Sequence, residues 1–222
     1  GAGTQILAGT NTYTGPTTVS NGTLMVHGSL AAASAVTVHG GALGGTGLIG
    51  GPTTVNSGGA IAPGASVGTL TVQNDVLWNA GTAWNFDLGL AGLSMASPGT
   101  SDLLNIAGVG SDFLKGSGGG WTFDFGGTGE MGWYKLVDWE GTSDFDSGDF
   151  TASNLPSGAY GSFTKDDETT ALYLNVIPEP SSLGLAGLWG IALLCRRLRR
   201  PRREVADVRN PPPHVIPCLT RR

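Results

Sequence analysis

The residues best suited to bind a metal ion are five acids that cluster between positions 137 and 150. They are Asp138, Glu140, Asp144, Asp146 and Asp149, in the stretch VDWEGTSDFDSGDF. Carboxylate oxygens are hard ligands of the kind that Ca²⁺ prefers. The spacing of Asp144, Asp146 and Asp149 is not that of an EF-hand loop. The sequence therefore leaves three hypotheses for this cluster: a solvent-exposed acidic loop, a calcium site at these three residues, and a catalytic role.

Two histidines are the other potential metal ligands of the body of the chain. His27 and His39 each precede a glycine at the end of a short Val-rich stretch. A zinc site would need at least one more ligand, and Asp75 is the acid nearest to them in sequence. We expect the histidines to be turn residues of a repeat, and we predict no cofactor.

The chain lacks the residue pairs that hydrolases and lyases use. Catalysis on polysaccharides needs paired acids, or acids beside a cation that stabilises a developing anion. Residues 1–195 contain no arginine and only Lys115, Lys135 and Lys165, and residues 1–77 contain a single acid. A G-x-S-x-G motif is absent, and the G-x-G-x-x-G match GTGLIG is followed at once by Gly51 and Pro52 rather than by a helix. We therefore predict that the chain is not an enzyme.

The stretch VIPEPSSLGLAGLWGIALLCRRLRR carries a different kind of chemistry, that of a targeting signal. Ile177, Pro178, Glu179 and Pro180 precede fifteen uncharged residues, 181–195. The first arginines of the chain follow directly, at Arg196, Arg197, Arg199 and Arg200. Residues 1–195 carry fifteen acids and three lysines, a net charge of −12, whereas residues 196–222 carry nine arginines and two acids, a net charge of +7. This distribution excludes a nucleic-acid-binding body and favours arginines on the cytoplasmic side of a membrane.

The order of these residues resembles the PEP-CTERM protein-sorting signal. That signal consists of a Pro-Glu-Pro motif, a short apolar helix and a basic cluster. The resemblance implies that residues 181–195 form a single short transmembrane helix, with the arginine cluster setting its topology. It also implies cleavage near Pro-Glu-Pro by an exosortase in a Gram-negative envelope. Residues 201–222 extend beyond the usual signal, and we expect them to form a disordered basic tail.

The elements that must carry this signal begin with a repeat in residues 1–77. Gly-Pro-Thr-Thr-Val occurs at residues 15–19 and again at 51–55, and similar Val/Thr stretches with glycine turns lie between and after them. Short strands at a regular spacing predict a solenoid, because one coil alone cannot bury its apolar face. The predicted core stripe consists of Val19, Leu24, Val26, Val36, Val38, Val55, Ile61, Leu70 and Val72.

The first 26 residues resemble the autotransporter-associated β-strand repeat of bacterial surface proteins. The shared features are Gly-x-Gly-Thr, Leu-x-Gly-x-Asn-x-Tyr-x-Gly and Thr-Thr-Val-x-x-Gly-Thr-Leu, in that order. The resemblance implies an all-β fold, a right-handed parallel β-helix. Unlike autotransporters, this sequence shows no terminal series of amphipathic strands for an outer-membrane barrel.

Residues 78–176 hold fifteen of the seventeen aromatic residues. Stretches such as TAWNFDL and WTFDF alternate aromatic and polar positions, as strands do. We predict an aromatic-rich β cap that closes the solenoid, either as a wider end of the β-helix or as a small β-sandwich. The tryptophans of this segment could stack on sugars, but their strand spacing favours the core.

These features predict an exported, non-enzymatic protein of the cell surface or extracellular matrix, structural or adhesive, which passes through the inner membrane. The expected partners are an exosortase, the membrane through residues 181–195, and an exopolysaccharide. Two alternatives stay open. The chain is the stalk of a secreted carbohydrate-active enzyme whose catalytic domain lies upstream, or it is a membrane-anchored protein that is never cleaved.

Overall fold

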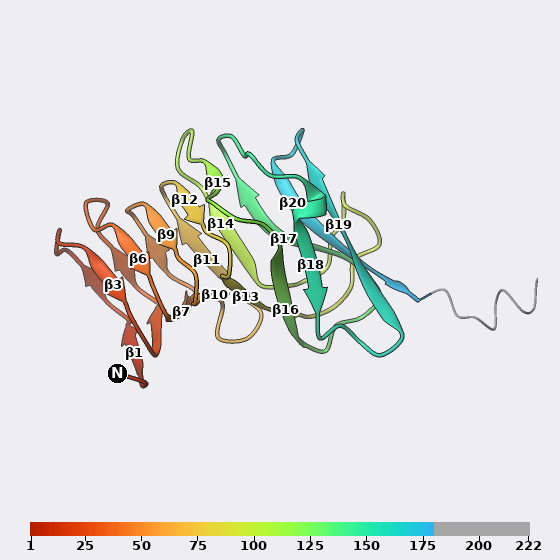
Figure 1. Cartoon of the computed structure of the whole chain (residues 1–222), viewed down its shortest axis with the longest axis horizontal. Helices are drawn as coiled ribbons and strands as arrows, with labels where there is room; N and C mark the ends of the chain where they lie inside the picture. Colours follow the sequence, from red (N-terminus) through yellow and green to blue (C-terminus); the bar gives the residue numbers. More distant parts are fainter. Residues whose placement is uncertain (180–222) are drawn as a thin grey trace, which may run out of the picture. The chain divides into compact units, whose positions relative to one another are not determined.

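The computed structural model describes residues 1–179, whose β-strands lie in three sheets (Figure 1). The first sheet contains, in spatial order, β1 (Thr4–Leu7), β4 (Thr23–Val26), β7 (Gly41–Gly45), β10 (Gly59–Pro63), β13 (Ala83–Leu88), β16 (Trp121–Gly127) and β18 (Phe150–Ser153). The second contains β2 (Thr10–Asn11), β5 (Ser29–Leu30), β8 (Leu48–Ile49), β11 (Thr69–Val72), β14 (Leu103–Ile106), β17 (Gly132–Trp139), β20 (Ala171–Pro178) and β19 (Ala159–Asp166). The third contains β3 (Thr17–Val19), β6 (Val36–Val38), β9 (Thr53–Val55), β12 (Val76–Trp78) and β15 (Phe113–Lys115).

The strands follow one another around a coil. From β1 to β17, strands enter the first, second and third sheet in turn, so neighbours within a sheet are three strands apart in sequence. β18 then joins the first sheet directly beside β16. Every pairing from β1 to β18 is parallel, and Figure 1 shows successive coils side by side in chain order. This is the coiled arrangement of parallel sheets that the repeats predict. The right-handed sense of the coil stays a prediction from the resemblance.

Equivalent residues of successive coils lie in columns, and the inward columns form the core. One column runs Val19, Val38, Val55 and Trp78, and all four side chains are buried. The nine residues of the predicted core stripe are all buried, with exposed fractions of 7% or less. Because each buried aliphatic side chain contributes roughly 1.5–3 kcal/mol, stacking supplies what a single coil cannot.

The coils lengthen towards the C-terminal part of the unit. A second column of the third sheet contains Thr17, Val36, Thr53, Val76 and Phe113, so successive coils take 19, 17, 23 and 37 residues. The Gly-Pro-Thr-Thr-Val spacing of 36 residues therefore covers two coils. Residues before and after position 77 contribute strands to the same three sheets.

Aromatic side chains fill the interior of the longer coils. The Trp78 ring lies 4.2 Å from the Trp121 ring and 5.3 Å from the Phe113 ring, measured between centroids. Trp84, Phe145 and Phe150 also surround it, at 5.4, 5.8 and 5.2 Å. Aromatic rings therefore replace the Val and Leu side chains of the shorter coils as the coil grows in length.

The described chain ends in an antiparallel hairpin. After β18, which η1 (Ser147–Asp149) precedes, β19 and β20 pair with each other along eight residues, and β20 also pairs antiparallel with β17. The second sheet thus ends in strands that run against its coil direction. A parallel coil leaves an open strand edge on which a further coil could pair. Here the hairpin covers the edge of β17, and β19 becomes the outer strand of the second sheet.

Within residues 1–179, no helix is long and apolar enough to cross a membrane. The predicted transmembrane helix, the arginines Arg196, Arg197, Arg199 and Arg200, and the predicted basic tail at 201–222 lie outside the described residues. The all-β part of the predicted fold is confirmed, whereas the helix stays a prediction.

Candidate functional site

The first three residues of the predicted sorting motif lie at the end of the folded unit. Ile177 and Pro178 are the last residues of β20, and Glu179 follows them; Pro180 lies outside the described residues. Ile177 is half-buried, whereas Pro178 and Glu179 are exposed. No linker separates the β-sheet from the motif.

Strand β19 holds these residues in a ladder. Ile177 lies opposite Tyr160 and Pro178 opposite Ala159. The Glu179 N–H donates to the Gly158 carbonyl at 2.8 Å, which makes this the last hydrogen bond of the hairpin. The pairing therefore extends into the motif itself.

Pro178 fits this strand because of its position in the ladder. Antiparallel pairs alternate between hydrogen-bonded and non-hydrogen-bonded types. The Glu179–Gly158 bond places Pro178 opposite Ala159 in a non-hydrogen-bonded pair. A proline nitrogen at this position faces away from β19, towards the side of β17. On that side β17 begins at Gly132, opposite Val176, and no residue of β17 lies opposite Pro178. The missing N–H consequently costs no ladder bond.

A tight turn positions the carbonyl that receives the Glu179 N–H. The Ala159 N–H donates to the Pro156 carbonyl at 3.1 Å, closing a four-residue turn. Gly158, its third residue, has φ +76°, the left-handed value that a type II turn requires there. No heavy atom lies within 4 Å of a Cβ built on Gly158, so the constraint on this residue is purely conformational.

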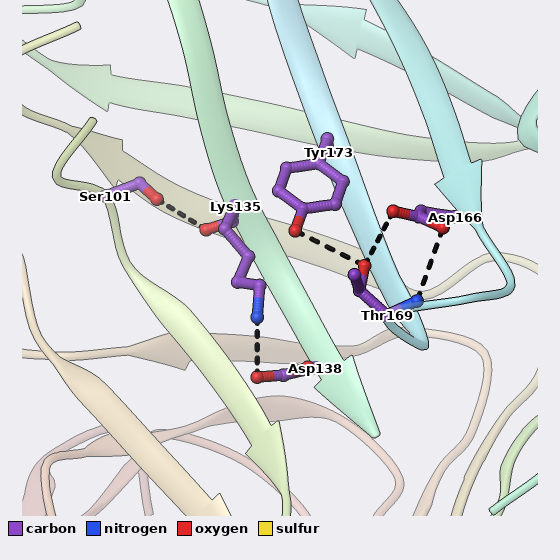
Figure 2. A network of polar contacts seen from close by, with 6 residues as sticks. All are labelled: Ser101, Lys135, Asp138, Asp166, Thr169 and Tyr173. Carbon is purple, nitrogen blue, oxygen red and sulfur yellow. Dashed lines mark hydrogen bonds and ion pairs between the residues drawn. The ribbon is translucent and has the colours of Figure 1, made fainter. Parts of the chain in front are cut away.

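Polar contacts fix the opposite end of the hairpin, as Figure 2 shows. The Thr169 hydroxyl donates to Asp166 at 2.7 Å and lies 3.5 Å from the Tyr173 hydroxyl. This hydrogen bond from Thr169, with the Glu168 N–H, holds the pKa of Asp166 below its usual value. The Lys135 ammonium, 6.0 Å from the Tyr173 ring centre, pairs with Asp138 at 2.7 Å (Figure 2). Strands β17, β20 and the β19–β20 turn are therefore held together on this face.

Two of the three aspartates of the calcium hypothesis, Asp144 and Asp149, contact a lysine. The Lys115 ammonium pairs with Asp149 at 2.7 Å, and the Lys115 N–H donates to Asp144 at 2.7 Å. Asp149 also accepts the Asp146 N–H at 2.9 Å. Partial burial alone would raise the pKa of Asp149, but the Lys115 and Asp146 hydrogen bonds hold that pKa below its usual value.

No group of three or more His, Cys, Asp or Glu side chains within residues 1–179 is arranged to hold a metal ion. The contacts of Lys115 account for the positions of Asp144 and Asp149. The calcium site at Asp144, Asp146 and Asp149 therefore stays a prediction.

The remaining candidates also have structural partners. His27 contacts Thr46 at 3.1 Å, and His39 contacts Asn56 at 3.3 Å. Both partners are side chains of the next coil along the chain. Four of the five tryptophans predicted to be interior, Trp78, Trp84, Trp121 and Trp139, are buried, so their faces are not open to sugars. The fifth, Trp133, is half-buried.

One notable residue has no signal in the sequence. Asp102 is 3% exposed and accepts the Gly68 N–H and the Asp87 N–H, each at 2.8 Å. Burial raises the pKa of Asp102 to about 7, against the opposing effect of these two hydrogen bonds. It lies beside a pocket of about 430 Å³ that Asp87 and Asp124 also line. A single aspartate between Ser101 and Leu103 gives no periodic or motif signal that could have identified it.

Comparison with known proteins gives matches at both ends of the chain. Residues 1–26 match the passenger-associated-transport-repeat, and residues 176–200 match the PEP-CTERM protein-sorting motif. The extracellular serine protease of Serratia marcescens is 38% identical over 94 residues. Those residues are 42% of this chain but only 9% of the protease, so the chain spans less than a tenth of that relative.

The two matches confirm both resemblances that the residues predicted. The PEP-CTERM match begins at Val176, inside β20, and the repeat match covers β1 to β4. A sorting motif together with an autotransporter-type repeat indicates an exported protein of the cell surface or the extracellular space.

Proposed function

We propose that this chain is the non-enzymatic, structural or adhesive part of an exported protein that an exosortase cleaves at the PEP-CTERM motif. The observation that carries this proposal is that the matched motif starts within the last strand of the folded unit. Cleavage near Pro178–Pro180 would leave every described strand up to β20 on the outer side of the membrane.

The contacts within residues 1–179 support a structural role. Each of the three lysines in this part of the chain forms an ion pair, with Asp149, Asp138 and Asp167 respectively. Neither His27 nor His39 contacts a serine or an acid there. The lysine contacts are those of structural ion pairs, and neither histidine has the serine and acid partners of a Ser-His-Asp arrangement within residues 1–179.

The route to the surface follows from the charge distribution. Residues 181–195 are uncharged, and arginines follow them, so this segment would halt in the inner membrane with its arginines in the cytoplasm. The acidic body would then lie outside, where an exopolysaccharide is the expected partner. Release or surface attachment would follow cleavage.

The intact mass of the mature protein tests this proposal. The protein would be recovered from the cell envelope and from the medium, beside a control in which Pro178, Glu179 and Pro180 are replaced by alanine. We expect a C-terminus near residues 178–180 in the wild type and an uncleaved chain ending at Arg222 in the control. A wild-type chain that ends at Arg222 and stays in the inner membrane would show instead an uncleaved, membrane-anchored protein.

A second function is favoured by the similarity to the extracellular serine protease. In this alternative, residues 1–179 are the stalk of a secreted enzyme whose catalytic domain lies elsewhere in the polypeptide, a protease or a carbohydrate-active enzyme. The sequence encoded upstream separates the two proposals. Further repeats would support the structural role, and a non-repetitive domain that binds an active-site serine probe or holds an acid pair would support the stalk.

A further inference from the structure

We infer that the β19–β20 hairpin controls access to the sorting motif, so that the processing enzyme reaches Pro-Glu-Pro only after the last pairs of the hairpin open. This inference rests on the proposed function. It goes further because it assigns a regulatory role to residues far from the motif in sequence.

The first step concerns how an enzyme would bind the motif. Proteins commonly capture an extended peptide by adding it as a strand, through alternate main-chain N–H and C=O groups. In an antiparallel strand, those groups point to one side at odd positions and to the other side at even positions. A peptide must therefore offer one free edge over several residues.

The second step is that neither edge of β20 offers a continuous run of free main-chain groups at the motif. On one side, Glu179 bonds to Gly158, and Ile177 lies opposite Tyr160. On the other side, Val176 pairs with Gly132 of β17, and Pro178 has no N–H to offer. Between Val176 and Glu179, the Pro178 carbonyl is the main-chain group that remains for a new partner on that side.

The third step is that the end of the hairpin is able to open. Pro178, Glu179 and Tyr160 are exposed, and Tyr160 has an exposed fraction of 44%. The inward side chains of β20 that anchor it in the core, Leu172, Leu174 and Val176, all precede the motif. Opening the last three pairs therefore breaks few apolar contacts, while β20 stays in the sheet through Val176.

The turn at Gly158 offers a way to change this opening without touching the motif. Its carbonyl receives the Glu179 N–H, and its φ of +76° disfavours any residue with a Cβ. Gly158→Ala strains the turn without a steric clash, because no atom lies within 4 Å of the new Cβ. Gly120→Ala is a matched control, since Gly120 has φ +75°, an equally open surrounding, and a position in the loop before β16.

The experiment measures the cleavage rate of the full-length chain in cells that contain an exosortase, by pulse-labelling and intact mass. Four chains are compared: the wild type, Gly158→Ala, Gly120→Ala, and a linker variant. The linker variant carries eight Gly and Ser residues and then an isoleucine, inserted between Ile177 and Pro178. It keeps β20 paired through Ile177 and moves an intact Ile-Pro-Glu-Pro away from the sheet.

We expect Gly158→Ala to be cleaved roughly fivefold faster than the wild type, the linker variant at least as fast, and Gly120→Ala at the wild-type rate. Amide exchange of Glu179 should accelerate in Gly158→Ala and stay unchanged in Gly120→Ala, which separates local opening from general unfolding. Equal cleavage rates in all four chains would overturn the inference and leave the proposed function standing. Absence of cleavage in every chain, including the linker variant, would overturn the proposed function.

Discussion

Asp102 lies in the interior of the coils, where folding changes how tightly its carboxyl holds a proton. Its carboxyl is buried, its pKa is raised to about 7, and its two oxygens accept N–H groups from Gly68 and Asp87. The carboxyl therefore ties β11 to β13 through the loop that precedes β14. Burial costs the charged form free energy that the hydrogen bonds only partly return.

This geometry gives stability a defined dependence on pH. The pKa of Asp102 is higher in the folded chain than the ordinary aspartate value of 3.8, so the folded state binds the proton more tightly than the unfolded state does. The stabilisation is complete below about pH 4 and is lost as the pH rises towards 7. We expect the free energy of unfolding to fall by on the order of 1 kcal/mol between pH 5 and pH 8, after allowance for solvent in the adjoining pocket. Urea unfolding at the two pH values measures it.

Asp102→Asn is the control for this pH dependence. The asparagine amide does not titrate, so the free energy of unfolding of this variant should be the same at pH 5 and pH 8. Its NH₂ group cannot accept one of the two N–H groups that Asp102 accepts. A variant that keeps the wild-type pH dependence would show that another group causes it.

Close contact between coils explains one glycine of the first sheet. A Cβ on Gly45, whose φ is +108°, would lie 2.1 Å from the Val26 carbonyl oxygen of the preceding coil. Gly45→Ala should lower the free energy of unfolding by more than about 2 kcal/mol, because the backbones of two coils must separate. Gly110 has a φ of +73°, but no atom lies within 4 Å of a Cβ built there. Gly110→Ala should therefore lower the free energy of unfolding by only about 1 kcal/mol. If both variants lose the same free energy of unfolding, the close approach of the two coils at Gly45 does not restrict this position.

At the scale of elements, the aromatic interior is the part of the core with the largest side chains. Trp78 is fully buried and contacts five aromatic rings. Trp78→Ala should lower the free energy of unfolding by about 3–5 kcal/mol through the cavity it leaves. Trp133→Ala, on the half-buried outer face of β17, should cost less than about 2 kcal/mol. Chemical denaturation followed by circular dichroism compares them, and similar losses would contradict a core role specific to Trp78.

The sequence predicts the coils better than it predicts how they end. Val19, Val38 and Val55 repeat with glycine turns, so each strand and its buried face follow from local pattern. The hairpin of β19 and β20 depends instead on pairing across the whole unit, with Gly132 opposite Val176 and Ala159 opposite Pro178. The sequence marks Ile177 and Pro178 as part of a sorting signal, yet the structure includes them in β20. The local sequence around Pro178 cannot show that its nitrogen faces the side of β20 that β17 does not reach.

The same limit applies to Asp102. Its two N–H donors, Gly68 and Asp87, are 34 and 15 residues away and meet it only after the coils have stacked. The aspartates between positions 144 and 149, by contrast, are visible as a cluster in sequence, but their partner Lys115 belongs to the preceding coil.

At the scale of the whole folded unit, the hairpin decides what the last coil exposes. Without β19 and β20, the edge of β17 and the inward side chains of the longest coils would meet solvent. We expect a chain ending at Glu179 to stay monomeric and a chain ending at Asn154 to self-associate, because an unpaired strand edge of eight residues is a template for further pairing. Light scattering at equal concentrations distinguishes the two. A monomeric, cooperatively folding shorter chain would show that the hairpin is dispensable for closing the unit.

The place of β20 between two antiparallel neighbours also bears on mechanical load. A pull on the C-terminal end of this strand acts along its length, at right angles to its hydrogen bonds. Eight residue pairs with β19 and six with β17 then share the force at once instead of breaking one after another. The strand that leads out of the folded unit is thus loaded in shear. A tether attached through β20 therefore loads its pairs with β19 and with β17 together.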